Sequence, residues 1–167
     1  SSLLDALDRI EEIVDDTLLL AREGKTVETF DPIVISELVG QCWGMVDTAN
    51  ASFETQDEFT ILGDRKRLQQ VFANLFRNAV EHGGREVTVR IGKLDESGFF
   101  VEDNGPGIPA EERDEVFETG YSSSESGTGF GLAIVRTIAE AHDWTVTVTA
   151  AGSGGARFEF RDVTIQS

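Results

Sequence analysis

The sequence predicts an α+β fold, a two-layer α/β sandwich in which a mixed, mostly antiparallel sheet is covered on one face by helices. Short segments of alternating polarity and longer apolar helical stripes follow one another without the regular strand–helix–strand order of a parallel sheet. The 167 residues, of which 40% are hydrophobic, suffice for one core. No internal repeat is present, so a single main domain is expected.

The first segment, residues 3–21, is predicted to be a helix with an apolar seam. Its apolar positions recur at alternating steps of four and three, which is typical of a coiled coil or an antiparallel bundle. The alternative is an amphipathic helix packed on the core of this same domain. The seam consists of Leu3, Leu7, Ile10, Val14, Thr17 and Ala21.

Short strands and two helices are expected next. Residues 27–30 form a candidate strand that Asp31-Pro32 interrupts, and a helix opens at Ser36 and runs to about Thr48. A strand at 59–62 precedes a helix over 64–82, for which Asp64 is a good N-cap and Gly83-Gly84 a stop.

The second half is expected to supply most of the sheet. Its alternating segments predict a pair of strands followed, after a loop and a helix, by a closing hairpin. A segment rich in Gly, Ser and Pro, residues 103–131, predicts a mobile loop with one short helix near 110–117. The strands are expected at 86–94, 98–102, 145–149 and 156–160, with the helix at 128–141.

The charge balance excludes several partners. The net charge is −17, from 31 acidic against 14 basic residues, and this field would repel nucleic acid and anionic membranes. Only three basic residues are lysines, which favours a protein that works at high salt over an ordinary acidic domain. The single cysteine, Cys42, rules out an internal disulfide, and a reducing, intracellular location is the simpler interpretation.

Two asparagines lie one turn apart on the helix 64–82. Asn74 and Asn78 are placed opposite the apolar stripe of this helix, and asparagine is a poor helix former, so their positions require an explanation. The stripe, which is expected to face the core, consists of Leu68, Val71, Phe72, Leu75, Phe76 and Ala79. Amide oxygens presented to a hard cation such as Mg²⁺ are one explanation. A solvated face, or hydrogen bonds to a neighbouring loop, is the other.

A second group of polar residues follows the predicted strand 98–102. Asp103 is followed by Asn-Gly-Pro-Gly-Ile-Pro, a carboxylate at a strand end with two glycines close behind. Such a carboxylate can accept a hydrogen bond from the amino group of a base, while the glycines allow close backbone approach. The alternative is a turn stabilised by the Asp103 side chain alone.

A third group, Gly127-Thr-Gly-Phe-Gly131-Leu132, opens the predicted helix 128–141. Backbone N–H groups at a helix N-terminus favour phosphate, and the helix dipole adds to the attraction. No Gly-Lys-Ser/Thr follows, so this is no Walker A loop, and the glycine spacing differs from the dinucleotide fingerprint.

Taken in order, these three groups resemble the ATPase superfamily of gyrase, chaperone, kinase and mismatch-repair proteins. Within it the chain resembles the sensor histidine kinases. Asn74-Leu-Phe-Arg-Asn78-Ala is similar to their N box, Asp103 to Pro109 to the G1 box, and Val116-Phe117-Glu118 to the F box. Gly127 to Ala133 is similar to the G2 box.

The resemblance covers residues 25–161 and implies ATP as substrate with Mg²⁺ as cofactor. It implies a catalytic ATP-binding domain over 25–167, while residues 1–24 resemble the end of the second helix of the dimerisation domain. Asn78 would hold Mg²⁺, Asp103 would bind the adenine amino group, and residues 110–128 would form a mobile ATP lid. The nucleotide-binding residues would be Asn74, Asn78, His82, Asp103, Gly105, Gly107, Ile108, Tyr121, Gly127, Thr128, Gly129, Phe130, Gly131 and Leu132.

By the same resemblance, the domain would donate the γ-phosphoryl group of ATP to a histidine on a dimerisation domain. Neither His82 nor His142 stands on the seam helix, so the acceptor is expected outside this chain. The further partners would be a response-regulator receiver domain and a second copy of the parent protein. The domain would be cytoplasmic, while the parent could carry a membrane anchor.

The chain departs from the family pattern at several positions. Glu81 stands where the family often has lysine, Arg113 is the only basic residue of the lid, and Asp143-Trp144 replaces a glycine pair. A contribution from Arg77 or Arg85 to phosphate binding stays undecided. These departures keep two alternatives open, namely a degenerate nucleotide-sensing or dimerisation module without turnover and a serine kinase of the same superfamily. A gyrase-like hydrolase is disfavoured because the expected glutamate base is replaced by Asn74.

Overall fold

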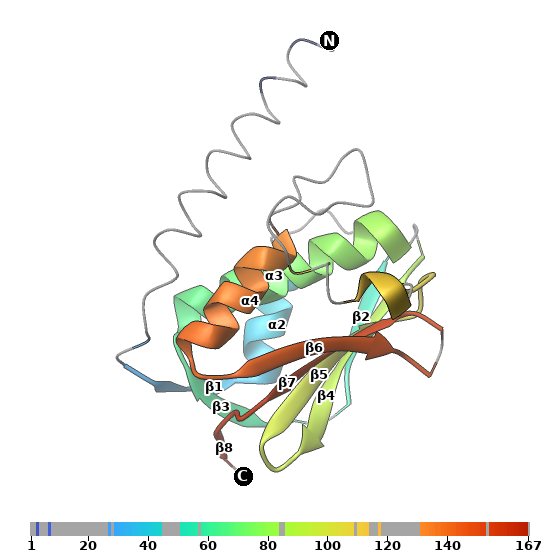
Figure 1. Cartoon of the computed structure of the whole chain (residues 1–167). Helices are drawn as coiled ribbons and strands as arrows, with labels where there is room; N and C mark the ends of the chain where they lie inside the picture. Colours follow the sequence, from blue (N-terminus) through green and yellow to red (C-terminus); the bar gives the residue numbers. More distant parts are fainter. Residues whose placement is uncertain are drawn as a thin grey trace.

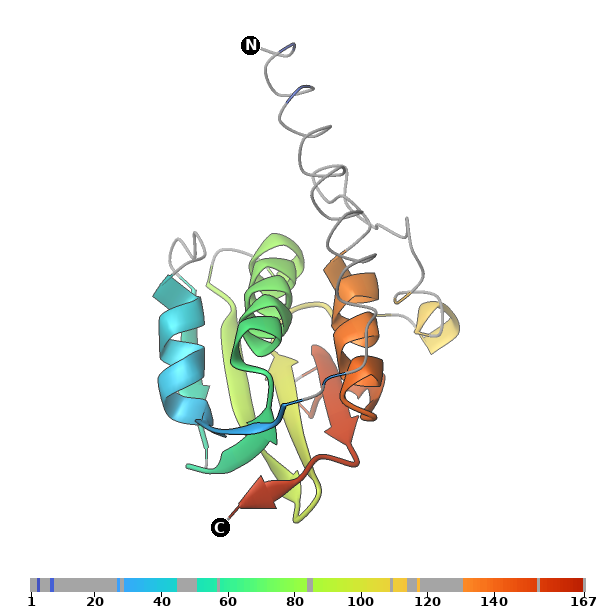
Figure 2. The ribbon, with the colours of Figure 1, turned by 90° about the vertical axis from the view of Figure 1, so that its left-hand side faces the viewer.

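The computed structural model describes residues 3, 7, 27, 29–44, 51–56, 58–83, 86–108, 110–113, 117, 131–152 and 154–166. It confirms the predicted two-layer α+β fold, with three helices side by side on one face of a five-stranded sheet (Figures 1 and 2). The helices are α2 (Ile35–Gly44), α3 (Arg65–Gly83) and α4 (Gly131–Ala141), with a short 3-10 turn at Ala110–Glu112. The strands are β1 (Asp31–Val34), β2 (Ser52–Thr55), β3 (Thr60–Gly63), β4 (Thr88–Asp95), β5 (Gly98–Asp103), β6 (Thr145–Ala150), β7 (Ala156–Arg161) and β8 (Ile165–Gln166).

The main sheet has the strand order β2-β4-β5-β7-β6. Only β2 and β4 run parallel, and the other three pairs are antiparallel, so the sheet is mixed and mostly antiparallel as predicted. A second, smaller sheet has the order β1-β3-β8 and crosses the end of the domain where the C-terminus lies (Figure 1).

The core lies between the helices and the inner face of the main sheet. The predicted apolar stripe of α3 is confirmed, because Leu68, Val71, Phe72, Leu75, Phe76 and Ala79 are all buried. Alternate residues of the strands meet this stripe, and the ring of Phe99 stacks on that of Phe160 with centroids 4.6 Å apart. Phe99 and Phe160, which are opposite each other on two antiparallel strands, therefore lie on the same face of the sheet, as a period of two requires.

The N-terminus of α3 is capped as the sequence predicts. The Oδ1 atom of Asp64 accepts a hydrogen bond from the N–H of Arg67 at 3.3 Å, three positions into the helix. The cap fixes where α3 begins, and thereby fixes the register of Asn74 and Asn78 along it.

Several elements differ from the sequence predictions. The strand predicted at 27–30 is wrong, because the strand begins at Asp31 and includes Pro32. Proline is tolerated there because β1 is an edge strand, paired only with β3. Strands β2 and β8 were not predicted, and the part of the predicted helix 36–48 beyond Gly44 lies outside the described residues.

Two further predictions fall mostly on residues outside the described ranges. Of the seam helix, only Leu3 and Leu7 are described; both are helical and exposed, at 70% and 53%. Of the predicted lid, residues 110–113 and Phe117 are described. Within the described ranges no helix is long and apolar enough to cross a membrane.

Candidate nucleotide-binding site

The polar face of α3 carries Asn74, Arg77 and Asn78. Asn74 is 7% exposed, so of the two explanations that the sequence left open for it, a solvated face does not apply. Its Oδ1 atom accepts a hydrogen bond from Nη1 of Arg77 at 3.2 Å, while its buried Nδ2 has no hydrogen-bond partner among the described residues. A buried amide donor without a partner is costly, so this N–H group is suited to donate to a bound molecule.

The strand β5 ends in Asp103, whose carboxylate organises the turn that follows. Oδ1 of Asp103 accepts hydrogen bonds from the N–H of Gly105 at 2.9 Å and from the N–H of Ala156 at 3.3 Å. The first bond is the side-chain-stabilised turn that the sequence left open as an alternative. The second ties the carboxylate to β7, so its orientation is set by two strands.

Backbone packs directly on backbone behind this turn. Gly107 has a φ of 79°, and a Cβ on it would come within 2.8 Å of the carbonyl oxygen of Gly154. A Cβ on Gly155 would overlap the carbonyl oxygen and carboxylate of Asp103. The hairpin between β6 and β7 therefore forms the back wall of the Asp103 turn. The sequence predicted a closing hairpin here but not its contact with the Asp103 turn.

Three apolar side chains anchor the segments around the turn. Ile108 and Leu132 are partly buried and pack against the core. Phe117, of the predicted F box, is buried, and its ring meets that of Phe158 edge-on at 6.0 Å. Arg113, the one basic residue of the predicted lid, donates from Nε to the carbonyl oxygen of Ile108 at 3.3 Å. These contacts hold the first part of the predicted lid, at Arg113 and Phe117, to the domain.

The structure describes only part of the predicted site. It places Asn74, Asn78, Asp103, Gly105, Gly107, Ile108 and Leu132, while Gly131 is the first residue of α4. The side chains of His82 and Glu81 lie outside the described part, as do Tyr121, Gly127, Thr128, Gly129 and Phe130.

Comparison with known proteins decides the family. Residues 63–164 match the family described as "Histidine kinase-, DNA gyrase B-, and HSP90-like ATPase". The chain belongs to this ATPase family.

Similar proteins indicate which branch of this family the domain resembles. The "Probable sensor histidine kinase TcrY" of Mycobacterium tuberculosis is 35% identical over 167 residues, 90% of this chain and 35% of that protein. "Sporulation kinase C" of Bacillus subtilis is 29% identical over 168 residues, 94% of this chain and 39% of that protein. The chain thus spans little more than a third of the length of these relatives.

Solved structures agree with this placement. The ATP binding domain of PrrB from Mycobacterium tuberculosis has a TM-score of 0.62 at 26% identity, covering 80% of this chain and 96% of that one. Full-length ShkA in complex with AMPPNP has a TM-score of 0.78 at 28% identity, covering 99% of this chain and 38% of that one. The ATPase domain therefore corresponds to the ATP-binding catalytic domain of sensor histidine kinases.

At the end of the ATPase domain remote from the Asp103 turn, His142 joins α3 to α4. Its Nε2 accepts the N–H of Asp64 at 3.0 Å, and its Nδ1 donates to the carbonyl oxygen of Ile138 at 2.8 Å. Only a neutral ring with its proton on Nδ1 can make both bonds. Burial lowers the pKa of His142. The ring is thus a structural link between α3 and α4.

The unusual Asp143-Trp144 pair completes this region. Asp143 adopts a φ of 64°, and the N–H of Trp144 donates to the carbonyl oxygen of Ala139 at 2.9 Å, which is the usual termination of a helix by a left-handed residue. The Trp144 ring stacks on His142 with centroids 4.3 Å apart. The replacement of the glycine pair therefore affects packing, as expected.

The remaining candidates are structural. Cys42 is buried, and burial raises the pKa of its thiol to about 11, so it is protonated and unreactive at neutral pH. Trp43 packs against Phe53 and Phe76, with centroids 5.1 Å from each. Neither side chain lies at the nucleotide boxes.

Proposed function

We propose that this chain is the catalytic domain of a two-component sensor histidine kinase and binds Mg·ATP to donate its γ-phosphoryl group to a histidine on a dimerisation domain. The observation that carries the proposal is the fixed carboxylate of Asp103, at a strand end and backed by glycine backbone. An ionised carboxylate only accepts hydrogen bonds, which suits the adenine amino group and disfavours the guanine carbonyl.

The N-box residues divide the phosphate and metal contacts between them. Oδ1 of Asn74 is engaged by Arg77, whereas its buried Nδ2 donor has no described partner, so Asn74 suits a phosphate oxygen. Asn78, one turn further on, would present its amide oxygen to Mg²⁺, a hard cation that prefers oxygen ligands. When bound, the metal neutralises charge on the phosphates; the chain's own residues bind and orient the nucleotide.

Phosphoryl transfer depends on positioning more than on covalent chemistry from this domain. A separate helix can therefore supply the acceptor histidine, and residues 1–24 would belong to that bundle. The parent protein would then act as a homodimer with a receiver domain as its downstream partner. It would work at the cytoplasmic side of a membrane if it carries an anchor, and at high salt.

The alternatives predict different chemistry. A hydrolase would need a base where this chain has Asn74, and an amide cannot take a proton from water. A module without turnover would still bind nucleotide but leave it intact. Phosphate on serine instead of histidine would indicate the serine-kinase branch.

The test is calorimetric titration of Mg·ATP into the wild-type chain and into Asn78→Ala. The variant should lose about 2–3 kcal/mol of Mg²⁺-dependent affinity, by analogy with charge-assisted contacts. Gln70→Ala is the matched control, since this exposed amide lies two turns earlier on the same helix. Equal affinity of Asn78→Ala and wild type would remove Asn78 from the metal site.

Two further measurements complete the test. Asp103→Asn should lose the preference for ATP over GTP; an unchanged ratio would contradict the role of Asp103. In the full-length parent, Asn78→Ala should abolish acid-labile phosphate incorporation while Gln70→Ala retains it. Acid-stable label in the wild-type parent would contradict transfer to histidine.

A further inference from the structure

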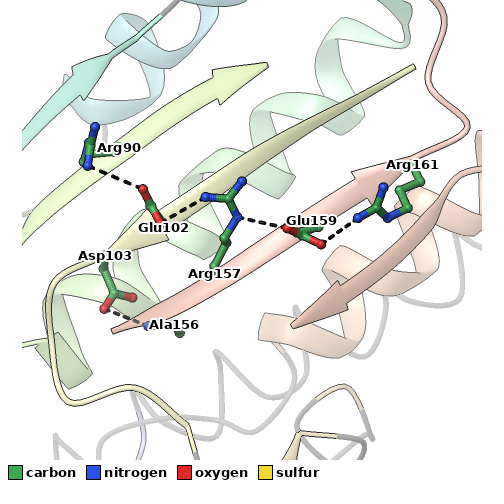
Figure 3. A network of polar contacts seen from close by, with 7 residues as sticks. All are labelled: Arg90, Glu102, Asp103, Ala156, Arg157, Glu159 and Arg161. Atoms are coloured by element: carbon green, nitrogen blue, oxygen red, sulfur yellow. Dashed lines mark hydrogen bonds and ion pairs between the residues drawn. The ribbon is translucent and has the colours of Figure 1, made fainter. Parts of the chain in front are cut away.

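The outer face of the main sheet, away from the helices, carries a continuous row of ion pairs (Figure 3). Glu102 lies 3.7 Å from Arg90 on one side and 3.4 Å from Arg157 on the other. Arg157 and Arg161 each lie 2.9 Å from Glu159. We call these five residues the arginine–glutamate row. It links β4, β5 and β7.

One pair of this row lies directly behind the predicted base site. Glu102 and Arg157 are opposite each other in the register of β5 and β7. The next residue on the one strand is Asp103 and the preceding residue on the other is Ala156, which are themselves joined by the 3.3 Å hydrogen bond. Because side chains alternate between faces, the ion pair lies outside and the Asp103–Ala156 contact lies inside.

Arg157 is held at three points. Its guanidinium contacts Glu102 and Glu159, and its Cζ atom lies 3.9 Å from the centre of the Phe100 ring. This arrangement uses the fork geometry and flat face that distinguish arginine from lysine. One side chain therefore fixes the end of β5 relative to the start of β7.

The partner carboxylate is largely removed from solvent. The Glu102 side chain is 8% exposed and lies between two arginines. Buried ion pairs contribute little net stability, because desolvation offsets the attraction, and their best-attested benefit is to fix register. Glu102 and its two arginines are thus better suited to fixing the positions of the strands relative to one another than to adding stability.

We propose that Arg157, acting through Glu102, is a positioning residue for adenine recognition. It sets the separation of β5 and β7 where Gly155 and Ala156 meet Asp103. Because the backbone of Gly155 lies directly against both the carbonyl oxygen and the carboxylate of Asp103, a shift of β7 reaches that carboxylate without a Gly155 side chain to absorb it. The inference rests on the proposed role of Asp103 in binding the base.

The experiment compares Arg157→Met with Arg161→Met. Methionine keeps an unbranched chain over Phe100 but removes the charge and the fork. Arg161 is the matched control: it lies on the same strand and face and shares the partner Glu159, but pairs in register with Gly98 at the other end of β5. Each variant is titrated with Mg·ATP and Mg·GTP, and its unfolding is followed in urea.

We expect Arg157→Met to bind ATP about tenfold more weakly, the loss of about one hydrogen bond, with a reduced ATP-to-GTP ratio. Arg161→Met should bind both nucleotides within about twofold of wild type, whatever its stability. Arg157→Lys should be intermediate, since lysine restores the charge without the fork. Wild-type affinity and selectivity in Arg157→Met, or equal losses in both methionine variants, would overturn the proposal.

Hydrogen exchange of the Ala156 amide, measured without nucleotide, tests whether Arg157 holds Ala156 against Asp103. Arg157→Met should speed its exchange relative to the amide of Phe160 on the same strand, and Arg161→Met should not. If the wild-type chain binds no ATP, the proposed function fails, while the exchange result still decides whether Arg157 positions Ala156 against Asp103. Unchanged exchange in Arg157→Met would overturn that positioning role directly.

Discussion

Mild acid should destabilise this domain through His142. The ring is 3% exposed, and its Nε2 is the acceptor for the capping residue of α3. Protonation would turn this acceptor into a donor that faces the N–H of Asp64. Burial is the main cause of the lowered pKa of His142, and Arg67 adds to it, while the Ile138 hydrogen bond and the Asp64 carboxylate oppose it.

The direction and magnitude of this pH effect on stability follow from the linkage between proton binding and folding. Because the folded-state pKa is lowered, the native state binds fewer protons than the unfolded chain, whose histidine titrates near 6.5. Titration of His142 therefore leaves the free energy of unfolding unchanged above about pH 6.5. Below that pH it lowers the free energy of unfolding progressively, until the pH reaches the folded-state pKa. The slope for one proton is about 1.4 kcal/mol per pH unit, so the loss by pH 5 is at most about 2 kcal/mol.

The assay is urea unfolding from pH 8 to pH 5 for wild type and His142→Gln. Glutamine does not titrate but keeps an acceptor and a donor. It should lower stability by about 1–3 kcal/mol at pH 8, through the loss of hydrogen-bond geometry and of the stack on Trp144. The gap between the two proteins should narrow below pH 6.5, since all other titrating groups, His82 included, are common to both. Parallel curves down to pH 5 would refute the reasoning.

Two further predictions concern the helix end and the charge. Asp143→Gly should raise the free energy of unfolding by about 0.5–1 kcal/mol, because glycine adopts the positive φ of 64° without steric cost; a lower stability in urea would show that the Asp143 side chain makes a contact worth more. Affinity for Mg·ATP should rise as KCl increases from about 0.01 to 1 M, since the Debye length falls from about 30 to about 3 Å and the net charge of −17 is screened; a steady fall in calorimetric titrations would mean that basic groups dominate the site.

The elements that sequence analysis predicted correctly are those with strong local periodicity. The apolar stripe of α3 and the cap at Asp64 before it form one continuous signal, and the helix itself has nineteen residues. Strand β2 has no comparable signal, because its four residues pair in parallel with β4, 36 positions later. Pro32 was taken to end a strand, but an edge position removes the need for its missing N–H.

The candidate site was predictable only where one segment carries it. Asp103 and the glycines after it form a local motif, and the structure shows the turn that the sequence left open as an alternative for it. The burial of Asn74 comes from the packing of other elements around α3, and the use of Gly155 depends on the approach of a hairpin 52 residues beyond Asp103. A hairpin turn does not by itself need two adjacent glycines, so the pair Gly154-Gly155 was the signal in the sequence that could have indicated this close contact.

The placement of positive charge explains why this domain should depend strictly on Mg²⁺. Of the 14 basic residues, three are lysines and eleven are arginines. Three of the arginines lie in the arginine–glutamate row on the outer face of the sheet (Figure 3). Near the boxes, Arg77 and Arg113 donate to Asn74 and to the Ile108 carbonyl, so either would have to give up a structural bond to reach phosphate. The arginines of the described part that lie closest to the nucleotide boxes thus position them. We therefore expect the metal and backbone N–H groups to neutralise the phosphates, and ATP without a divalent cation to bind far more weakly than Mg·ATP in calorimetric titrations.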